Sequence, residues 1–185
     1  MQTTSFSWDV LVVDDDEDVR ELIVSFFTTL GARVATAQDG RAAVLELERS
    51  AGRYGLVVTD VNLPGADGFS VLAAARRANA SCYVVVVTGY ASLDSAIQAV
   101  RGGAYDYLPK PFSLGQLDLI LQRITDRASL EEENRRLALA GQRLTDRLSL
   151  SSLAGVEDRL AAIESAVARI ESSLGTQAGP SSARR

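Results

Sequence analysis

The sequence contains no histidine, one cysteine, four prolines and no long hydrophobic run. Without histidine, the chain itself cannot provide Ser–His or Cys–His catalysis, a histidine-based zinc site or a phosphohistidine. The single cysteine, Cys82, excludes an internal disulfide framework, and its position before an apolar run predicts a small core residue. No stretch approaches the ~18 apolar residues of a membrane span, and the polar N-terminus does not resemble a secretory signal. We therefore expect a cytoplasmic protein without membrane contact.

Charge and length narrow the possible functions further. The net charge of −5 argues against a nucleic-acid partner, because a nucleic-acid-binding surface normally carries a basic stripe. A chain of 185 residues with 46% hydrophobic residues suggests one ordinary domain with an extension, or two small domains. The acidic residues leave open a carboxylate cluster for a hard cation.

The segment around Asp60 organises the rest of the chain. Residues 56–59 form a run rich in β-branched residues between Gly55 and Pro64, too short for a helix, which predicts a buried parallel strand. Ligands of doubly wound sheets collect outside the carboxyl ends of the strands, and Asp60 stands at such an end. Taken alone, Asp60 could equally cap the turn that follows. The choice depends on which other side chains reach the same edge.

Four further apolar segments alternate with amphipathic helical patterns and predict a parallel α/β sheet within residues 8–125. The carboxyl ends of the first, third, fourth and fifth strands are expected to lie at one edge of this sheet. The strands are expected at residues 9–13, 34–37, 56–59, 83–88 and 106–108, and the side chains at the shared edge are Asp14, Asp15, Asp60, Thr88 and Lys110.

Five consecutive acids, residues 14–18, follow the first strand. A solvated turn with an acidic helix N-terminus explains the later acids, because the helix dipole favours them. It explains less well the two acids against the strand end, which a divalent cation would stabilise. Oxygen ligands of this kind suit Mg2+. Acids, a hydroxyl and an ammonium group around Asp60 suit a phosphoryl group on that residue, with Thr88 donating one hydrogen bond and Lys110 pairing with another oxygen.

Four segments carry a resemblance to a known family. They are Val12-Val13-Asp14-Asp15, Asp60-Val61-Asn62-Leu63-Pro64-Gly65, Val87-Thr88-Gly89 and Tyr107-Leu108-Pro109-Lys110-Pro111-Phe112. In this order and spacing, residues 8–125 resemble the receiver domain of response regulators in two-component signalling. The resemblance implies a flavodoxin-like fold, a five-stranded parallel sheet of order 2-1-3-4-5.

The resemblance also implies a phosphoacceptor site. Asp60 would receive a phosphoryl group from a histidine kinase, and Asp14 and Asp15 would help Asp60 to bind Mg2+. Asn62 would contribute its backbone carbonyl to the metal. Three acids follow Val13, so the metal pair could instead be shifted by one residue, although the family pattern favours the first two. No enzymatic activity is expected beyond self-phosphorylation from a phosphodonor and slow autodephosphorylation.

The remaining implied roles concern the response to phosphorylation. Thr88 and Lys110 would sense the phosphoryl group, and Tyr107 would be the aromatic switch that turns inward. The Lys110–Pro111 peptide bond is expected to be cis, as proline allows. Asn62 and Tyr90 stand at positions where the resemblance implies tuning of the phosphate lifetime, but Tyr90 could equally be a packing aromatic.

The last third of the chain reads as helix. Ser113 is expected to cap a helix that glycine and proline do not interrupt before Gly141. We expect a helical linker over residues 126–148, which continues the last receiver helix, a heptad helix over 149–175 and a disordered tail over 176–185. A 3,4 spacing of apolar residues from Leu153 to Leu174 predicts a coiled coil, and Asn134 could set the register of an earlier seam.

Three arrangements of this region remain open: a solvated single helix, a helical hairpin, and the preferred parallel homodimer. The five-residue gap between Leu148 and Leu153 breaks the phase, so residues 149–152 could form a kink, a turn or a stutter. No phosphate-binding glycine-rich loop and no basic recognition helix is visible among residues 126–185. We therefore expect output through the helices, by dimerisation or by docking of an unknown output protein.

Two other functions are alternatives for this sequence. A DNA-binding transcriptional regulator would use its C-terminal helices and contact the duplex through Arg135, Arg136, Arg143 and Arg147. A magnesium-dependent phosphatase or phosphotransferase would need a general acid two residues after Asp60, where Asn62 stands instead.

Overall fold

The computed structural model describes residues 8–89 and 91–175, and the side chains of these except residues 144, 146–158 and 170–175. The predictions for Tyr90 and for the tail over 176–185 lie outside this part. Strands and helices alternate along the chain. The strands are β1 (Asp9–Val13), β2 (Arg33–Ala37), β3 (Tyr54–Asp60), β4 (Tyr83–Thr88) and β5 (Asp106–Pro109). The helices are α1 (Glu17–Thr29), α2 (Gly40–Arg49), α3 (Gly68–Ala78), α4 (Leu93–Gly102) and α5 (Leu114–Gly175).

The five strands form one parallel sheet of order β2-β1-β3-β4-β5, which confirms the predicted fold. The order places β3 at the centre, with β1 and β4 on either side. Asp60 pairs in register with Val87 of β4, so the ends of β3 and β4 lie side by side. The polar residues at or just after the carboxyl ends of β1, β3, β4 and β5 therefore meet at one edge, as the sequence predicts.

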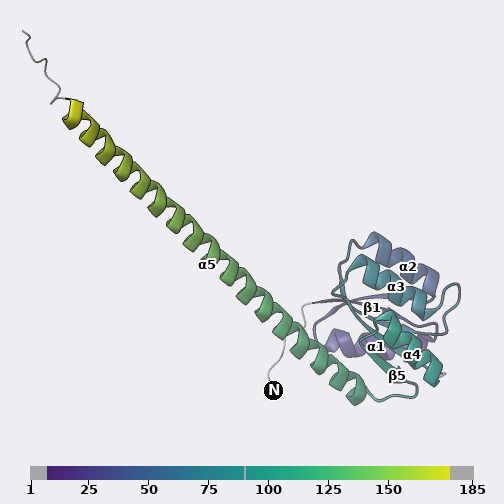
Figure 1. Cartoon of the computed structure of the whole chain (residues 1–185). Coiled ribbons are helices and arrows are strands. Elements are labelled where there is room, and N and C mark those ends of the chain that lie inside the picture. The colour runs from purple at the N-terminus through teal and green to yellow at the C-terminus, as the bar shows by residue number, and fades with distance from the viewer. Residues whose placement is uncertain (1–7, 90, 176–185) are drawn as a thin grey trace, which may run out of the picture. The chain divides into compact units, whose positions relative to one another are not determined.

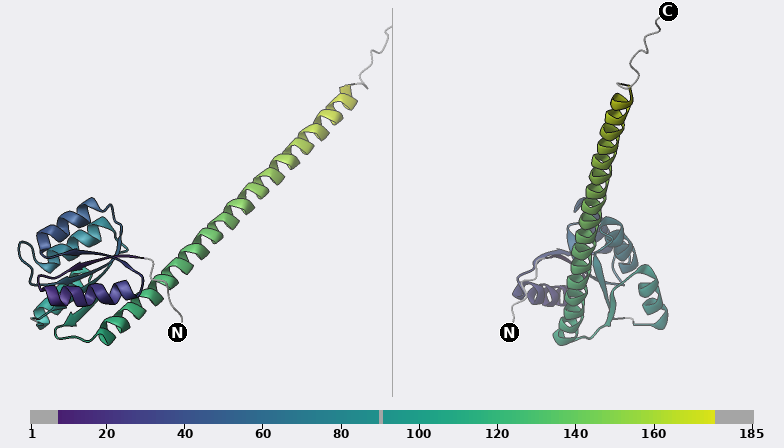
Figure 2. Two further views of the ribbon diagram at one scale, coloured as in Figure 1. Left: turned by 180° about the vertical axis from the view of Figure 1, so that it is seen from behind. Right: turned by 60° about the vertical axis from the view of Figure 1, so that its left-hand side comes forward.

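Alternation of side chains along the strands divides the core into two layers. In β1, Val10 and Val12 face a cluster with α1 and the first turns of α5, whereas Leu11 and Val13 face a cluster with α2 and α3. Figure 1 shows α2 and α3 on one side of the sheet and α1 on the other, and Figure 2 gives the view from behind. Because both faces are covered, the inner strands are apolar along most of their length, with polar residues near their ends.

Polar caps set the helix starts. Asp16, Asp39 and Asp67 cap α1, α2 and α3 by accepting hydrogen bonds from backbone amides of the first turn. Ser92 and Ser95 form a reciprocal capping box at the start of α4. Ser113 accepts from the amide of Gln116 at 3.3 Å, which supports its predicted role at the start of α5. Each of these caps fixes the direction in which the chain leaves the functional edge.

The final helix differs from one expectation. α5 is a single helix of 62 residues that runs through residues 149–152 without a turn. A helical hairpin needs a turn there, so this arrangement is excluded, while a local change of heptad phase remains compatible with a continuous helix. The chain divides into two compact units, residues 1–125 and 126–185, and α5 contributes to both. Among the described residues, none of the helices is long and apolar enough to span a membrane.

Candidate functional site

Asp60 is the last residue of β3, and its carboxylate is held on both oxygens. Oδ1 accepts a hydrogen bond from the backbone amide of Asn62 at 3.2 Å. Oδ2 lies 2.8 Å from the Nζ of Lys110. The residue is 7% exposed, so the carboxylate is reachable from one direction but fixed in orientation.

Lys110 links three strands at this edge. Its backbone amide donates to the carbonyl of Thr88 at the end of β4, at 2.8 Å. Its Nζ donates to Oδ2 of Asp14, the residue after β1, at 2.7 Å, in addition to the bond with Asp60 at the end of β3. The Lys110–Pro111 peptide bond is cis, which confirms that expectation. One ammonium group thus bridges two carboxylates from neighbouring strands.

The charges of this cluster are not balanced. Burial raises the pKa of the Asp14 carboxyl above its usual value, although the hydrogen bond from Lys110 opposes the shift. Burial alone would lower the pKa of Lys110, but its hydrogen bonds to the two carboxylates outweigh burial and raise it. The raised pKa of Lys110 means that its charged ammonium form is favoured. The raised pKa of Asp14 means that its charged carboxylate form is disfavoured. Asp14 is 1% exposed and shares its single cation with Asp60, so its desolvation is only partly offset.

Three carboxylates converge here. Asp14, Asp15 and Asp60 each offer an oxygen within 4.8 Å of the others. Asp16 instead uses its Oδ1 to accept from the amides of Asp18 and Val19 as the cap of α1. The geometry therefore supports the pair formed by Asp14 and Asp15 over the alternative shifted by one residue.

The donor set fits a hard divalent cation. All three groups are carboxylates, two of them buried and one exposed, which matches the oxygen ligands that Mg2+ prefers while leaving room for water. A divalent cation would also relieve the unfavourable charge on Asp14. Asn62 lies beside this cluster through its amide contact with Asp60, and the role of its carbonyl stays a prediction.

Close backbone packing holds the loop that follows Asp60. Gly68 begins α3 so near to β3 that a Cβ there would lie 2.0 Å from the carbonyl oxygen of Asp60. Gly40, the first residue of α2, donates its amide to the carbonyl of Pro64 at 3.1 Å. A Cβ at Gly40 would lie 1.8 Å from the carbonyl of Ala66, so both positions require glycine.

The two predicted response residues lie on neighbouring strands. Thr88, at the end of β4, is fully buried next to the register pair of Asp60 and Val87. Tyr107 of β5 is half-buried, and its hydroxyl lies 2.8 Å from Ser95 Oγ. Ser95 is the residue that completes the capping box of α4. The orientation of Tyr107 is thus tied to the N-terminus of α4.

Two residues near the site were not identified from the sequence. Arg20 of α1 donates from Nη1 to the backbone carbonyl of Asp14 at 2.8 Å. Ser95 contacts Tyr107 as described above. The signal for Arg20 was a lone basic residue two positions after an acidic run, and the signal for Ser95 was the Ser-x-x-Ser spacing from Ser92.

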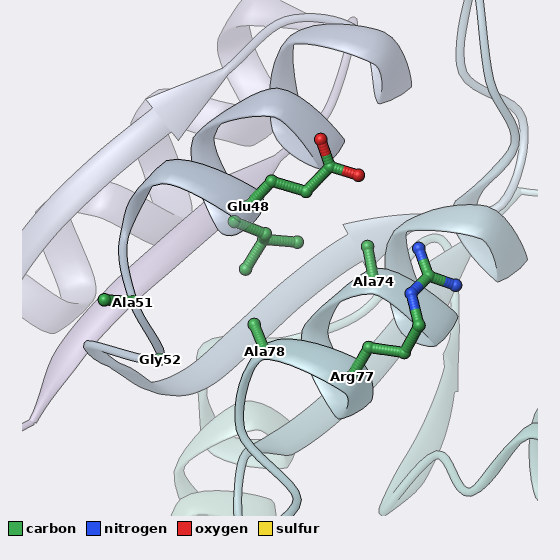
Figure 3. Close-up of a pocket in the computed structure, with 7 residues that line it drawn as sticks. Glu48, Ala51, Gly52, Ala74, Arg77 and Ala78 are labelled. Carbon is green, nitrogen blue, oxygen red and sulfur yellow. The ribbon is translucent and has the colours of Figure 1, made fainter.

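A pocket elsewhere in the fold is separate from this chemistry. It lies between the ends of α2 and α3, where the chain returns to the amino ends of β3 and β4, and Asp60 is not among its lining residues (Figure 3). Its lining residues are Leu47, Glu48, Ala51, Gly52, Ala74, Arg77 and Ala78.

The thiol of Cys82 is buried in the core as predicted, and burial raises its pKa to about 12.

The comparison with known families agrees with this geometry. A family model described as a response regulator receiver domain matches residues 10–122, well over half of the chain. The chain belongs to the response regulator receiver family. The matched range includes the acidic cluster, Asp60, Thr88 and Lys110. A receiver is a signalling domain of two-component systems, which confirms the family predicted from the sequence.

Curated relatives of this receiver are regulatory proteins. It is 37% identical over 131 residues to the C4-dicarboxylate transport transcriptional regulatory protein DctD of Pseudomonas aeruginosa, covering 71% of this chain and 28% of that protein. It is 32% identical over 131 residues to the nitrogen assimilation regulatory protein NtrX of Azorhizobium caulinodans, covering 70% of this chain and 28% of that protein. The matches to these two relatives thus span little more than a quarter of their length.

Solved receiver structures share the fold. A response regulator receiver domain protein from Clostridium thermocellum matches with a TM-score of 0.61 and 26% identity, covering 66% of this chain and 98% of that one. The Vibrio cholerae chemotaxis protein CheY4 matches with a TM-score of 0.58 and 29% identity, covering 64% and 98%.

Proposed function

We propose that Asp60 accepts a phosphoryl group from a histidine kinase and that α5 transmits this change by helix-mediated association. The observation that carries the proposal is the position of the Asp60 carboxylate, which is fixed between the Asn62 amide and the Lys110 ammonium. Asp14 and Asp15 lie close enough to complete a magnesium site with Asp60. This constellation suits phosphoryl transfer, in which positioning and charge stabilisation provide most of the catalysis.

The transfer needs no other nucleophile. An oxygen of the Asp60 carboxylate attacks the phosphorus of the phosphohistidine. The new P–O bond forms as the P–N bond breaks, and the imidazole leaves with the electron pair of that bond and takes a proton from solvent. Asp14, Asp15 and Asp60 would hold Mg2+, which would supply charge neutralisation for the phosphoryl oxygens. Hydrolysis of the acyl phosphate by water later restores the carboxylate.

Lys110 must exchange a partner in this step. Its Nζ now bonds to Asp60 Oδ2, and a phosphoryl group of roughly −2 charge offers it a stronger acceptor at the same place. Thr88 is the last residue of the adjacent strand, and we propose that its hydroxyl donates to a second phosphoryl oxygen. Movement of Thr88 toward the phosphoryl group frees space toward Tyr107, whose hydroxyl would then leave Ser95.

The output is proposed to pass through α5. Several large apolar side chains of this helix beyond residue 125 are exposed to solvent, which is costly unless another surface covers them. They are Leu130, Leu137, Leu139, Leu160, Ile163 and Val167. Their heptad spacing in the distal part suits a second copy of the same helix, and we propose a parallel homodimer. An output protein that docks on the same face is the alternative partner.

A second candidate function follows from the names of the relatives. DctD and other curated relatives are called transcriptional regulatory proteins, so a role in DNA binding merits a test. Arg135 and Arg136 each pair with Glu132 on the helix, at 3.4 and 3.0 Å, which reduces the charge available for phosphates. This observation favours the association model. Salt-dependent affinity for duplex DNA would support DNA binding instead.

Phosphorylation can be tested with acetyl phosphate and Mg2+ and read by intact mass. The protein is expected to gain one phosphoryl group, and Asp60→Asn is expected to gain none. Asp67→Asn provides a matched control, because Asp67 is an exposed cap of α3 and asparagine caps a helix equally well. Equal labelling of the Asp60→Asn protein would contradict the proposal.

A further inference from the structure

The single basic residue within the first turns of α1 lies against the acidic cluster. Arg20 stands six residues after Asp14, and its side chain is 16% exposed, which is low for an arginine on a surface helix. Its Nη1 donates to the Asp14 carbonyl at 2.8 Å, whereas its nearest acid, Glu17, lies 3.9 Å away and is 78% exposed. The guanidinium is thus committed to a main-chain oxygen rather than to a surface ion pair.

This carbonyl is at a critical point of the backbone. The pairing of β1 with its neighbouring strands ends at Val13. One more backbone hydrogen bond follows, from the amide of Asp14 to the carbonyl of Ala37 at 3.3 Å. The next carbonyl, that of Asp14, is buried, and a buried acceptor without a partner is costly. A charged donor from Arg20 meets this need with a stronger bond than a neutral group would make.

The bond also sets the direction of the following residue. The Asp14 carbonyl and the Asp15 amide share one rigid peptide plane, so a clamp on the oxygen fixes how Asp15 leaves the strand. The carboxylate of Asp14 is held in turn by the Asp16 amide at 3.0 Å and by Lys110. Arg20 therefore restrains the backbone between the two acids, in addition to the contacts that hold the Asp14 carboxylate.

We infer that Arg20 is a positioning residue of the cation site, and that it sets the approach of Asp14 and Asp15 to the metal through the Asp14 carbonyl. The inference rests on the proposed function, because it concerns the same cation. Two physical effects oppose each other here. A positive charge beside a cation site weakens binding by repulsion, whereas a preorganised pair of ligands strengthens it. Whether the affinity for Mg2+ rises or falls when Arg20 is removed distinguishes the two effects.

Titration calorimetry with MgCl2 measures the affinity directly on the full chain. Arg20→Met and Arg20→Gln both remove the charge, and we expect each to bind Mg2+ about tenfold more weakly, as expected when a residue that holds metal ligands in place is lost. Arg49→Met, at the exposed end of α2, removes an equal charge away from the site and should bind as the wild type does. Urea unfolding without Mg2+ reports any loss of stability separately from the loss of affinity.

Affinity that is unchanged or tighter in either folded variant overturns the inference, because repulsion alone predicts tighter binding. Circular dichroism establishes which variant is folded, and Arg20→Gln, which keeps a polar amide, provides the reading should the methionine variant unfold. If Arg20→Gln is also unfolded before any metal is added, the Arg20 bond is needed for the fold itself. That result also overturns a role specific to the cation. A wild-type protein that binds no Mg2+ contradicts the proposed function itself, so the two failures are distinguishable.

Discussion

The hydroxyl of Tyr107 on β5 lies 2.8 Å from the Oγ of Ser95, and that same Oγ accepts a hydrogen bond from the backbone amide of Ser92 at 3.1 Å. One hydroxyl thus joins the predicted aromatic switch to the first turn of α4. Inward rotation of Tyr107 cannot occur without releasing this bond. Ser95, a member of the capping box of α4, then loses one of its hydrogen-bond partners, which gives the state of the site a path to the surface of α4.

Tyr107→Phe removes this hydrogen bond while keeping the ring. We expect a loss of about 1 kcal/mol in the free energy of unfolding, the usual net value of one such bond. Ser95→Ala should cost more, because it also removes the capping interaction. In a double-mutant cycle by urea unfolding, the two changes should be non-additive by about 1 kcal/mol. Strict additivity would show that the two hydroxyls are not coupled.

Asp14→Asn is expected to stabilise the metal-free protein at neutral pH. Burial raises the pKa of Asp14 in the folded state above its unfolded value of 3.8, so the ionised form is disfavoured by folding. The stabilising contribution of its proton is complete below pH 3.8 and is lost as the pH rises through the folded pKa. The advantage of asparagine should therefore shrink as the pH falls from 7 toward 4. Urea unfolding in EDTA across this range measures it, and a constant difference would contradict the shift.

Asp15→Asn and Asp16→Asn remove the same charge from adjacent positions and separate the two possible metal pairs. Asp15 lies in the carboxylate cluster, whereas Asp16 caps α1, a role that asparagine fulfils equally well. At a Mg2+ concentration of 100 times Kd, a folded-state site stabilises a protein by about 2.7 kcal/mol. We expect Asp15→Asn to lose most of this gain and Asp16→Asn to keep it, as measured by thermal unfolding with and without MgCl2. The reverse order would move the metal pair by one residue.

The distal part of α5 offers a matched pair for self-association. Ile163 is 60% exposed on the heptad seam, and Ala162 is the exposed residue beside it. Ile163→Asn should weaken association at least tenfold, because it places an amide in the apolar seam. Ala162→Asn carries at least as large a helix-propensity cost without touching the seam. Sedimentation equilibrium of both variants checks this, and equal weakening would show that helix propensity alone, rather than the seam, matters.

Much of the fold was predictable because its pattern is local. Apolar runs end in turn residues at each strand, and the alternation with helices determines a parallel sheet whose ends converge. The strand order came from the resemblance and is confirmed. The helix over 149–152 was harder to predict, because a five-residue step in the seam is compatible with both a turn and a continuous helix, and the structure shows a continuous helix.

The site was predictable in its residues but not in its contacts. Asp14, Asp60 and Lys110 could be placed at one edge from the sequence, and the structure brings them within hydrogen-bond distance. The contact from Arg20 to the Asp14 carbonyl depends on how α1 packs beside β1, which periodicity does not specify. The contact between Tyr107 and Ser95 likewise depends on the relative position of β5 and α4.

The central claim is that the state of Asp60 controls association through α5. Sedimentation equilibrium of the wild type and of Asp60→Asn, each with Mg2+ and with or without beryllofluoride as a phosphoryl mimic, tests it most directly. The wild type is expected to change its association constant by at least about tenfold, equivalent to 1.4 kcal/mol of coupling, and Asp60→Asn should not respond. An identical constant for the wild type in both conditions, or an equal response of Asp60→Asn, would contradict the claim.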